Sequence, residues 1–415
     1  MTPASVDSPP FTSIQLPLDL SNLLGAPIAL REHTANFSAF NPTLLSTPSD
    51  AKSSVRLPPS ALLFFRVSNM HFCPDAAPPR NSWRDSVKMQ RQIYSYLGFA
   101  RLDRLHYSFQ TRGAILHSAS ELFISRSCEN SIDAGNGVFG SFRGAEDPRA
   151  IWSPDGTPWL VVSAWTNDCR RLRMHLLRFD DANTLLFDGA DPETLAPPRH
   201  VPLTVVGGWP TVATPGADRE WIYDPPHPEA LPLQKNWLPF FHDGMLYVEY
   251  AIEPHIVLRV DASSGHCTAV GSPYTVAPSA RFPSFMPLSA LESHYGSRFS
   301  GGAPPLHLPD WGIFLGLAHI KFTQGNSHHV GTSSMLYHQI FYAFVDRPPF
   351  EIVARGAPFT LPEQTARRPT VQFASGMTFD DARETITISY STLDCGMQLT
   401  SRSLRDVLKD IAIIW

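Results

Sequence analysis

The sequence predicts an all-β protein built from short antiparallel hairpins, and three observations support this fold class. Proline is abundant, with 39 residues among 415, and proline cannot donate to a central strand or fit inside a helix. From Asp147 onward, short aromatic or β-branched runs alternate with turns that contain Asp, Gly or Pro. No helical pattern separates these runs, which excludes a doubly wound parallel sheet and fits the radial blades of a β-propeller.

The first part of the chain is expected to contain an arm, a loop and one helix. Residues 1–30 are expected to form a loose N-terminal arm, rich in Pro, Ser and Thr at its start. Ser46–Ser60 is expected to be a surface loop between two strands. Trp83–Leu97 is expected to be a helix, because Ser82 and Asp85 have the spacing of a capping box and a glycine follows the segment.

The remaining chain is expected to form hairpins within one catalytic domain, residues 31–415. The expected strands are Ala150–Trp152, Trp159–Ala164, Leu238–Phe241, Met245–Tyr250, Ile256–Val260, Gly312–Ala318, Gln339–Phe344 and Thr385–Tyr390. Asp188–Leu233 is proline-rich with few strand signals, so it is expected to be a long loop over one face. A final helix, Leu404–Ile414, is expected to be capped by Ser403 with Asp406.

The charge balance and the apolar pattern indicate a soluble protein without nucleic-acid or membrane partners. The net charge is -5 and the sequence pI is about 6.3, so no basic field is available for binding nucleic acid. The N-terminus lacks a basic region followed by a long apolar core, as a signal peptide would have. No stretch reaches the ~18 consecutive apolar residues that a membrane span requires.

The cysteines indicate a cytoplasmic protein. The sequence contains five, which are scattered and never form a CxxC pair: Cys73, Cys128, Cys169, Cys267 and Cys395. Such a pattern favours reduced thiols that fill the core over a disulfide framework or a zinc site.

Several familiar catalytic motifs are absent from the sequence. It has no GxGxxG after a strand, no Walker loop, no HExxH and no GxSxG elbow. These absences argue against nucleotide-binding, zinc-protease and α/β-hydrolase functions. The remaining candidates for a functional site are polar residues at the ends of apolar strands.

The first candidate site is Glu146-Asp147-Pro148-Arg149, which leads directly into the strand at Ala150. The proline fixes the backbone after two adjacent carboxylates, and the arginine can balance their charge. This arrangement would turn at least one acid inward at the mouth of a strand. The alternative is a charged surface turn, for which Asp-Pro is common.

Other polar groups occupy comparable positions at strand ends. They are Lys235-Asn236-Trp237, Glu253-Pro254-His255, His319, and Ser389-Tyr390-Ser391 with Asp394. Taken singly, a lysine at a strand mouth can be a rim residue that extends to water, and an isolated histidine is more often a hydrogen-bonded structural residue. The pair His328-His329 lies in a Gly/Ser/Asn-rich stretch without carboxylates or cysteines at ligand spacing, so no metal site is expected.

The order of these motifs resembles a known enzyme family. The chain contains Gly-Ala-Glu146-Asp147-Pro148-Arg149, Lys235-Asn236-Trp237-x-Pro239-Phe240, Glu253-Pro254-His255, Gly301-Gly302-x-Pro304-Pro305 and His319 in this order. It thereby resembles the β-mannoside phosphorylases of glycoside hydrolase family 130. It is still more similar to the β-1,2-mannosyltransferase/phosphorylases of glycosyltransferase family 108. The resemblance spans about Asn41 to Asp394, and Glu-Asp-Pro-Arg is its most specific motif.

The resemblance implies a fold and a set of residue roles. The fold would be a five-bladed β-propeller with the site in its central depression. Asp147 would be the catalytic acid, which relays its proton through a sugar hydroxyl while phosphate attacks C1 from the opposite face with inversion. Phosphate would be bound by Arg149, Lys235 and His319, with Arg66 and Arg298 as further candidates. Sugar hydroxyls or faces would be held by Asn41, Glu146, Asn236, Trp237, Glu253, His255, Tyr390 and Asp394.

The chain departs from the family pattern at two places. After Ser389-Tyr390 the family usually has a glycine, where this chain has Ser391. Near Arg298 the family has a continuous Arg-Gly-Gly, which Phe299-Ser300 interrupts here. These departures concern the assignments of Asp394 and Arg298.

The resemblance predicts an inverting enzyme that extends and phosphorolyses β-1,2-linked mannan oligosaccharides. Its donor would be mannose 1-phosphate, with GDP-mannose as an alternative, its acceptors would be mannose and mannan oligosaccharides, and no cofactor would be needed. Two alternatives stay open at this point. A propeller glycosidase would hydrolyse mannosides with water and separated carboxylates, and a glycan-binding propeller would lack catalysis.

Overall fold

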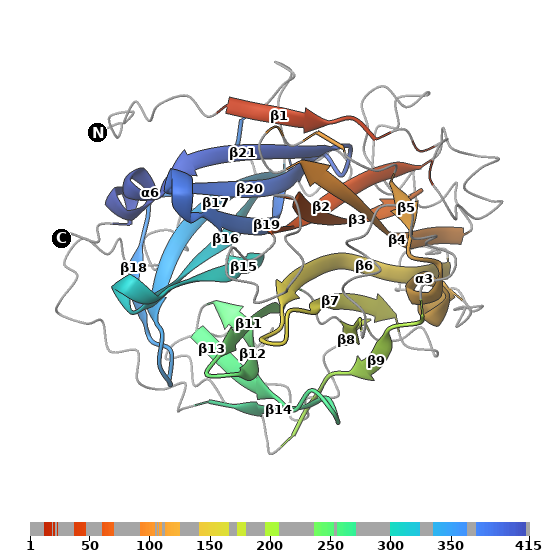
Figure 1. Cartoon of the computed structure of the whole chain (residues 1–415), viewed down its shortest axis with the longest axis horizontal. Helices are drawn as coiled ribbons and strands as arrows, with labels where there is room; N and C mark the ends of the chain where they lie inside the picture. Colours follow the sequence, from red (N-terminus) through yellow and green to blue (C-terminus); the bar gives the residue numbers. More distant parts are fainter. Residues whose placement is uncertain are drawn as a thin grey trace.

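The computed structural model consists mostly of β-strands with few helices, which confirms the all-β fold class (Figure 1). The structure describes residues 12–18, 20, 23, 37–46, 60–69, 92–103, 106, 108–109, 113–124, 141–165, 172–179, 196–206, 236–252, 255–270, 299–323, 335–362 and 371–411.

The strands form five antiparallel groups that follow one another along the chain. The groups are β2 (Ser38–Ser46), β3 (Ser60–Ser68), β4 (Gln92–Asp103) and β5 (Ala114–Ile115); β6 (Ser141–Trp152), β7 (Pro158–Trp165), β8 (Leu172–Arg178) and β9 (Arg199–Pro202); β11 (Leu238–His242), β12 (Met245–Ile252), β13 (His255–Val260) and β14 (His266–Ala269); β15 (Phe299–Leu308), β16 (Ile313–Thr323), β17 (Met335–Val345) and β18 (Ile352–Arg355); and β19 (Gln372–Asp380), β20 (Thr385–Thr392) and β21 (Met397–Ser403). A short parallel pairing of β4 with β6 joins the first two groups into one sheet, and β10 (Thr204–Val205) adds to β14 in parallel.

The N-terminal segment contributes a strand to the last group. β1 (Thr12–Leu16) pairs antiparallel with β21, and Thr12 lies opposite Ser401 (Figure 1). Backbone hydrogen bonds to β21 therefore order this part of the expected loose arm. The division into an arm and one domain stays a prediction.

The groups pack face to face, which explains their continuous apolar runs. In β3, Leu62 and Phe64 belong to one core cluster with β6 and β7, whereas Leu63 and Phe65 belong to another with β21. Successive side chains of a strand point to opposite faces. A strand covered on both faces therefore reads as an uninterrupted hydrophobic run, as β3 and β7 do.

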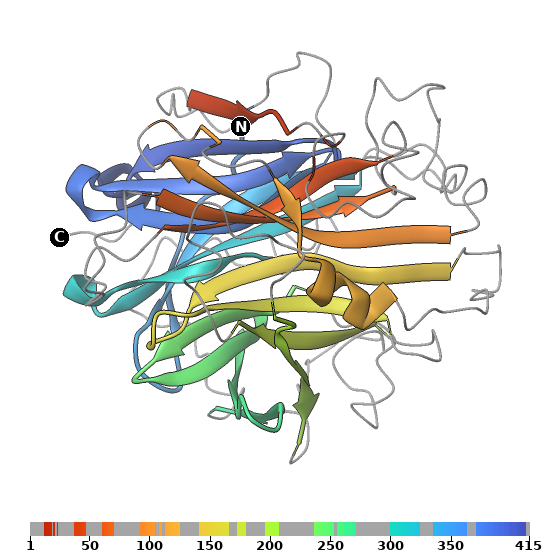
Figure 2. The ribbon, with the colours of Figure 1, turned by 45° about the vertical axis from the view of Figure 1, so that its right-hand side comes forward.

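Each of the five core clusters lies between two neighbouring groups. The clusters connect the first group to the second, the second to the third, and so on, and the fifth connects the last group back to the first. The first strands of the groups also contact one another in the cyclic order β2, β6, β11, β15, β19 and β2 (Figures 1 and 2). No hydrogen-bonded sheet in the described part closes on itself.

Small residues let the first strands approach closely. A Cβ at Gly301 would collide with the carbonyl oxygen of Asn236, and a Cβ at Gly302 would lie 2.6 Å from the carbonyl oxygen of Leu317. The Gly-Gly motif of β15 therefore serves close backbone packing near the middle of the molecule.

The predicted hairpins are confirmed where the structure describes them. β6 and β7 flank Pro154-Asp155-Gly156, and β11 and β12 flank Asp243-Gly244. Both turn residues of the second hairpin have positive φ, 49° and 73°, as a two-residue type I′ turn requires. Two further turns contain the 3₁₀ helices η5 (Pro309–Trp311) and η6 (Asp381–Arg383).

The predicted helix Trp83–Leu97 is wrong over its described part, because Gln92–Asp103 is strand β4. Tyr94 and Leu97 fit a helical face by spacing, but this stretch also contains β-favouring aromatic residues and pairs along the whole of β3. Gly98 gives room for the ring of Phe65, which a Cβ at that position would overlap. The glycine therefore serves strand packing rather than ending a helix.

The final helix is confirmed and another helix was missed. α6 (Leu404–Asp410) begins at Ser403, whose hydroxyl accepts a hydrogen bond from the backbone N–H of Asp406 at 3.1 Å. α3 (His117–Ile124) was not predicted from the sequence and packs against β4 and β6.

The expected loop Asp188–Leu233 contains the short strands β9 and β10 in its described part. Each extends a neighbouring group, so this segment is more ordered than its proline content suggests. Most of Ser46–Ser60, expected to be a loop, lies outside the described residues.

The cysteines differ from the prediction of uniformly reduced thiols. Cys395 is disulfide-bonded, whereas Cys267 is free and buried. Disulfides persist mainly in oxidising compartments, so Cys395 does not support the cytoplasmic location expected from the cysteines. Among the described helices, none combines the length and the hydropathy that crossing a membrane requires.

Candidate active site

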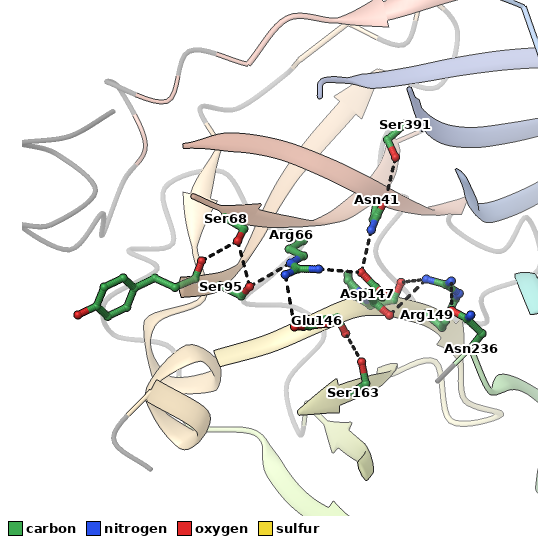
Figure 3. A network of polar contacts seen from close by, with 12 residues as sticks. Asn41, Arg66, Ser68, Ser95, Glu146, Asp147, Arg149, Ser163, Asn236 and Ser391 are labelled. Carbon is green, nitrogen blue, oxygen red and sulfur yellow. Dashed lines mark hydrogen bonds and ion pairs between the residues drawn. The ribbon is translucent and has the colours of Figure 1, made fainter. Parts of the chain in front are cut away.

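The first strands of two neighbouring groups share a backbone feature, a residue with positive φ directly before a proline. Asn41 (φ 51°) precedes Pro42 in β2, and Asp147 (φ 52°) precedes Pro148 in β6. The strand register shifts at both places, as in a β-bulge. Left-handed backbone costs a non-glycine residue about 1–3 kcal/mol and often marks a functional site. The bulges bring the two side chains together: Asn41 Nδ2 donates to Asp147 Oδ1 at 2.7 Å (Figure 3).

Arg66 of β3 supplies the positive charge of this cluster. Its Nη1 donates to Asp147 Oδ1 at 3.3 Å, and its Nη2 lies 3.4 Å from Glu146 Oε1. Its Nε donates to Ser95 Oγ at 3.0 Å (Figure 3). The side chain of Arg66 is only 3% exposed. Two carboxylates of the Glu-Asp-Pro-Arg motif therefore share one buried guanidinium.

The electrostatic environment of Arg66 is strongly anionic. Burial alone would lower the pKa of the guanidinium, but the charges of Glu146, Asp147 and Asp394 outweigh it and raise the pKa of Arg66 above its usual value. Arg66 therefore stays charged and stabilises the ionised form of Asp147.

Arg149 has a very different environment in the same site. Its Nη1 donates to the backbone oxygens of Asp147 and Pro148, each at 3.2 Å, and its Nη2 donates to Asn236 Oδ1 at 3.4 Å (Figure 3). Its guanidinium lies over the ring of Phe373, 4.9 Å from the centroid. It makes no ion pair with a carboxylate among the described residues, and its Nε is buried without a partner. Burial lowers the pKa of Arg149 to about 10, although Asp147 acts to raise it.

His319 is brought to the same region by aromatic packing. It is fully buried, stacks on Tyr337 with ring centroids 5.2 Å apart, and meets the edge of Phe373 at 5.1 Å. Since Arg149 lies over the same Phe373 ring, this phenylalanine joins two of the three predicted phosphate ligands. Neither Tyr337 nor Phe373 was singled out from the sequence.

Asp394 also belongs to this region. It has left-handed backbone (φ 47°) in the turn between β20 and β21. Its charge contributes to the raised pKa of Arg66. Burial, and then the charges of Asp394 and Asp147, raise the pKa of Tyr337 well above its usual value. Tyr337 therefore stays a neutral hydroxyl under the influence of both carboxylate charges.

Two neighbouring residues of β20, Tyr390 and Ser391, lie in surroundings that differ from the prediction. Tyr390 is buried in a core cluster and its hydroxyl donates to the backbone oxygen of Pro362 at 2.7 Å, so its expected sugar contact is not supported. Ser391 was part of the polar group Ser389-Tyr390-Ser391 and a departure from the family pattern, but was given no role of its own. Its hydroxyl donates to Asn41 Oδ1 at 2.7 Å (Figure 3), which places it in the site network.

Two other predicted sugar ligands are committed to the protein interior. Trp237 is 1% exposed and packs edge-on against Tyr250 in a core cluster, so it offers no open face for stacking. His255 uses both ring nitrogens, since Nδ1 lies 2.8 Å from the carbonyl oxygen of Phe350 and Nε2 lies 2.8 Å from Glu249 Oε1. This is the structural histidine that the sequence left open as an alternative.

The predicted site residues therefore divide into three sets. The residues brought together are Asn41, Glu146, Asp147, Arg149, Asn236, His319 and Asp394, with Arg66. Trp237, His255 and Tyr390 point elsewhere. Lys235, Glu253 and Arg298 lie outside the described residues. Their roles stay predictions.

The site combines two chemical capacities. Asp147 is a carboxylate held by two donors at one oxygen, which suits the transfer of a proton in a fixed direction. Arg149 carries a buried charge balanced mainly by neutral oxygens, which suits binding of an external anion. The described residues contain no cluster of three His, Cys, Asp or Glu side chains that could hold a metal ion.

Comparisons with known proteins give structural similarity at low sequence identity. No protein-family model and no curated protein matches the sequence. The fold is similar to a β-1,2-mannobiose phosphorylase from Listeria innocua, with a TM-score of 0.48, 14% identity and coverage of 94% of this chain and 95% of that chain. It is similar to a GDP-Man-dependent mannosyltransferase from Leishmania mexicana, with a TM-score of 0.47, 10% identity and coverage of 94% and 89%.

A mannose phosphorylase from Leishmania mexicana, solved with a phosphate ion, is also similar, with a TM-score of 0.44, 8% identity and coverage of 92% and 90%. Because these TM-scores are below 0.5, the similarity carries no functional conclusion for this chain. Its function has to be argued from the residues of the site.

Proposed function

We propose that this protein is an inverting β-1,2-mannosyltransferase/phosphorylase. It transfers mannose between mannose 1-phosphate and the end of a β-1,2-linked mannan oligosaccharide, with GDP-mannose as a second donor. The motif order from Asn41 to Asp394 supports the family assignment, which specifies the substrate class. The observation that carries the reaction type is Arg149, which lies beside Asp147 as a buried guanidinium and forms no ion pair with any carboxylate that the structure describes.

We also propose that the five strand groups form a five-bladed β-propeller. The cyclic contacts of the first strands and the five core clusters between neighbouring groups support this arrangement. Asn41, Asp147 and Asn236 belong to, or immediately precede, three of these first strands. In a propeller such positions face the central depression, where oligosaccharide substrates would bind.

Asp147 and Arg149 divide the chemistry between a proton and a phosphate. In synthesis, an acceptor hydroxyl oxygen attacks C1 of mannose 1-phosphate, and its proton passes to the Asp147 carboxylate. The bond between C1 and the phosphate oxygen breaks, and phosphate leaves with the electron pair beside Arg149. In phosphorolysis, a phosphate oxygen attacks C1 and Asp147 returns the proton to the departing glycosidic oxygen. No second carboxylate is needed as base, because phosphate is itself the nucleophile.

The direct test is phosphate release from mannose 1-phosphate when the purified full chain is given mannose or β-1,2-mannobiose. We expect release with the wild type and a loss of kcat of about 10³-fold with Asp147→Asn, the scale of general acid–base catalysis. Asp243→Asn is the matched control: Asp243 also has positive φ, 49°, but its side chain is 78% exposed in a turn. It should retain the wild-type rate.

Other outcomes identify the alternatives. Hydrolysis of β-1,2-mannobiose without phosphate, together with no reaction of mannose 1-phosphate, would indicate a glycosidase. Binding of mannan oligosaccharides without turnover, unchanged in Asp147→Asn, would indicate a glycan-binding protein. Either result would contradict the proposed phosphorylase chemistry.

A further inference from the structure

The bulge that carries Asn41 is held by three serine hydroxyls from the neighbouring group. Ser375 and Ser389 both donate to the backbone oxygen of Pro42, at 2.7 Å and 2.6 Å. Ser391 instead donates to the side-chain oxygen of Asn41 at 2.7 Å. All three serines are fully buried. We call Ser375, Ser389 and Ser391 the serine clamp.

Within the serine clamp, Ser391 is the member that contacts the side chain of Asn41. A carboxylate oxygen accepts hydrogen bonds and cannot donate when ionised, so the amide NH₂ of Asn41 has to face Asp147. The amide oxygen then faces Ser391, whose hydroxyl has to donate to it. The opposite orientation of the amide would place its oxygen against that of Asp147 and remove this hydrogen bond, while Ser391 would change from donor to acceptor.

We propose that Ser391 is a positioning residue for the proton-transferring carboxylate: its hydroxyl fixes the amide of Asn41, which in turn donates to Asp147. This inference rests on the role proposed for Asp147. Asn41 and Arg66 both bind Asp147 Oδ1 (Figure 3). With both donors in place, the plane of the carboxylate is fixed and its ionised form is stabilised.

The position of Ser391 also relates the two parts of the site. Ser391 lies directly opposite Phe373 in the pairing of β19 with β20, and opposite residues of an antiparallel pair point to the same face. Through Ser391 this face reaches Asn41 and Asp147, and through Phe373 it reaches Arg149. One pair of strands therefore supports both the carboxylate and the guanidinium.

Loss of the Ser391 hydroxyl should change the protonation of Asp147 in a defined direction. Within the described ranges, the charged and titratable groups that interact with Asp147 include Arg66 of β3, Glu146 and Arg149 of β6, Tyr337 of β17 and Asp394 of the β20–β21 turn. Ser391→Ala changes none of these charges. It releases the Asn41 amide, so the ionised carboxylate loses one donor and Asp147 should bind its proton at a pH about one unit higher.

The first measurement does not require turnover. The carboxyl of Asp147 can be titrated by NMR in protein with ¹³C-labelled aspartate carboxyls, with Asp147→Asn to assign its signal. We expect Ser391→Ala to raise the titration midpoint by about one pH unit relative to the wild type. Ser391→Thr keeps the hydroxyl and should restore the midpoint. Ser391→Cys, a weaker donor of similar shape, is the second variant if Ser391→Ala does not fold, and should shift the midpoint in the same direction.

The matched control is Ser375→Ala. It removes an equally buried hydroxyl that donates to the same bulge. Pro42 keeps its hydrogen bond from Ser389, and the Asn41 amide keeps its hydrogen bond from Ser391. Its Asp147 midpoint should therefore equal that of the wild type. An unchanged midpoint in Ser391→Ala, or an equal shift in Ser375→Ala, would overturn the proposal.

Kinetics give a second readout. For synthesis, the acidic limb of the kcat profile should move up with the carboxyl in Ser391→Ala, while KM for mannose 1-phosphate stays within about threefold. Because Ser391 acts through Asn41, adding Ser391→Ala to Asn41→Gly should have no further effect, whereas additive losses would contradict the relay. Glycine is used because it tolerates φ 51°. A wild type without turnover would refute the proposed function, and the titration would still decide the role of Ser391.

Discussion

The site contains two buried arginines with opposite surroundings. Arg66 faces Glu146 and Asp147 at ion-pair distance and responds to Asp394 as well, so its pKa is raised. Arg149 faces backbone oxygens, an amide oxygen and an aromatic ring, and burial lowers its pKa to about 10. Carboxylates neutralise the first guanidinium, whereas none of the described carboxylates lies at ion-pair distance from the second.

This difference indicates what each arginine is for. A buried charge is stable only when opposite charge or several hydrogen bonds compensate its desolvation. Arg66 receives this compensation from the chain itself, so it acts as a fixed partner of Asp147. Arg149 has hydrogen bonds to neutral oxygens but, within the described part of the chain, no carboxylate at ion-pair distance, so the binding of a phosphate group would complete its coordination. Stability measurements can test the contrast without any assumption about the sugar.

Arg66→Met should cause the largest loss of stability. The substitution leaves Glu146, Asp147 and Asp394 close together without their shared cation, and breaking a buried ion pair in this way costs about 3–5 kcal/mol. We expect the free energy of unfolding in urea to fall by this amount at pH 7. The loss should shrink at acidic pH, where the carboxylates become protonated. A loss below about 1 kcal/mol would mean that the cluster is solvated and Arg66 is not its main counter-charge.

Arg149→Met should increase the free energy of unfolding, in contrast to Arg66→Met. Burial lowers the pKa of Arg149 to about 10 in the folded protein, below that of a free guanidinium, so keeping it charged costs about 3 kcal/mol at neutral pH. Methionine removes this cost but also loses hydrogen bonds, so we expect a net gain of about 1–2 kcal/mol in the free energy of unfolding. Since the unfolded state binds more protons above pH 10, the cost is present in full below pH 10 and disappears as the pH rises from there towards the pKa of a free guanidinium.

Inorganic phosphate provides the control for the same comparison. At ten times its dissociation constant, a ligand that binds only the folded state stabilises it by about 1.4 kcal/mol. Phosphate should therefore raise the melting temperature of the wild type and leave Arg149→Met unaffected, whereas equal amounts of chloride salt should affect both alike. A phosphate response that survives in Arg149→Met would place the anion elsewhere.

The overall fold class and many of the hairpins were accessible from the sequence because they depend on local signals. Asp243-Gly244 predicts its turn through backbone preference alone, and the turn forms with both φ values positive. Tyr94 and Leu97 show the limit of such reasoning. β4 is covered on both faces, so its apolar residues lack the alternation of a half-exposed strand and also fit helical spacing.

The sequence predicts site residues where a contiguous motif determines the local backbone. It does not predict those that only tertiary packing brings to the site. Asp147 is found because Asp-Pro at a bulge is a local feature. The choice of Tyr390 over Ser391 failed because adjacent residues of a strand point to opposite faces, and the sequence does not say which face borders the site. Tyr337 and Phe373 reach the site only because neighbouring strand groups pack together, and no motif marks them.

Phe373 offers the smallest and most specific test of the two environments. Its ring lies under the Arg149 guanidinium and against His319, and makes no such contact with Arg66. Phe373→Leu keeps an apolar side chain of comparable size but loses the cation–π attraction, which is worth about 0.5–2 kcal/mol. Phosphate affinity should therefore fall by about 2- to 30-fold. The Asp147 titration should stay at the wild-type pH, because the donors from Asn41 and Arg66 are intact. A shift of that titration instead of the phosphate affinity would show that the two arginines are coupled through β19 and that their environments do not act separately.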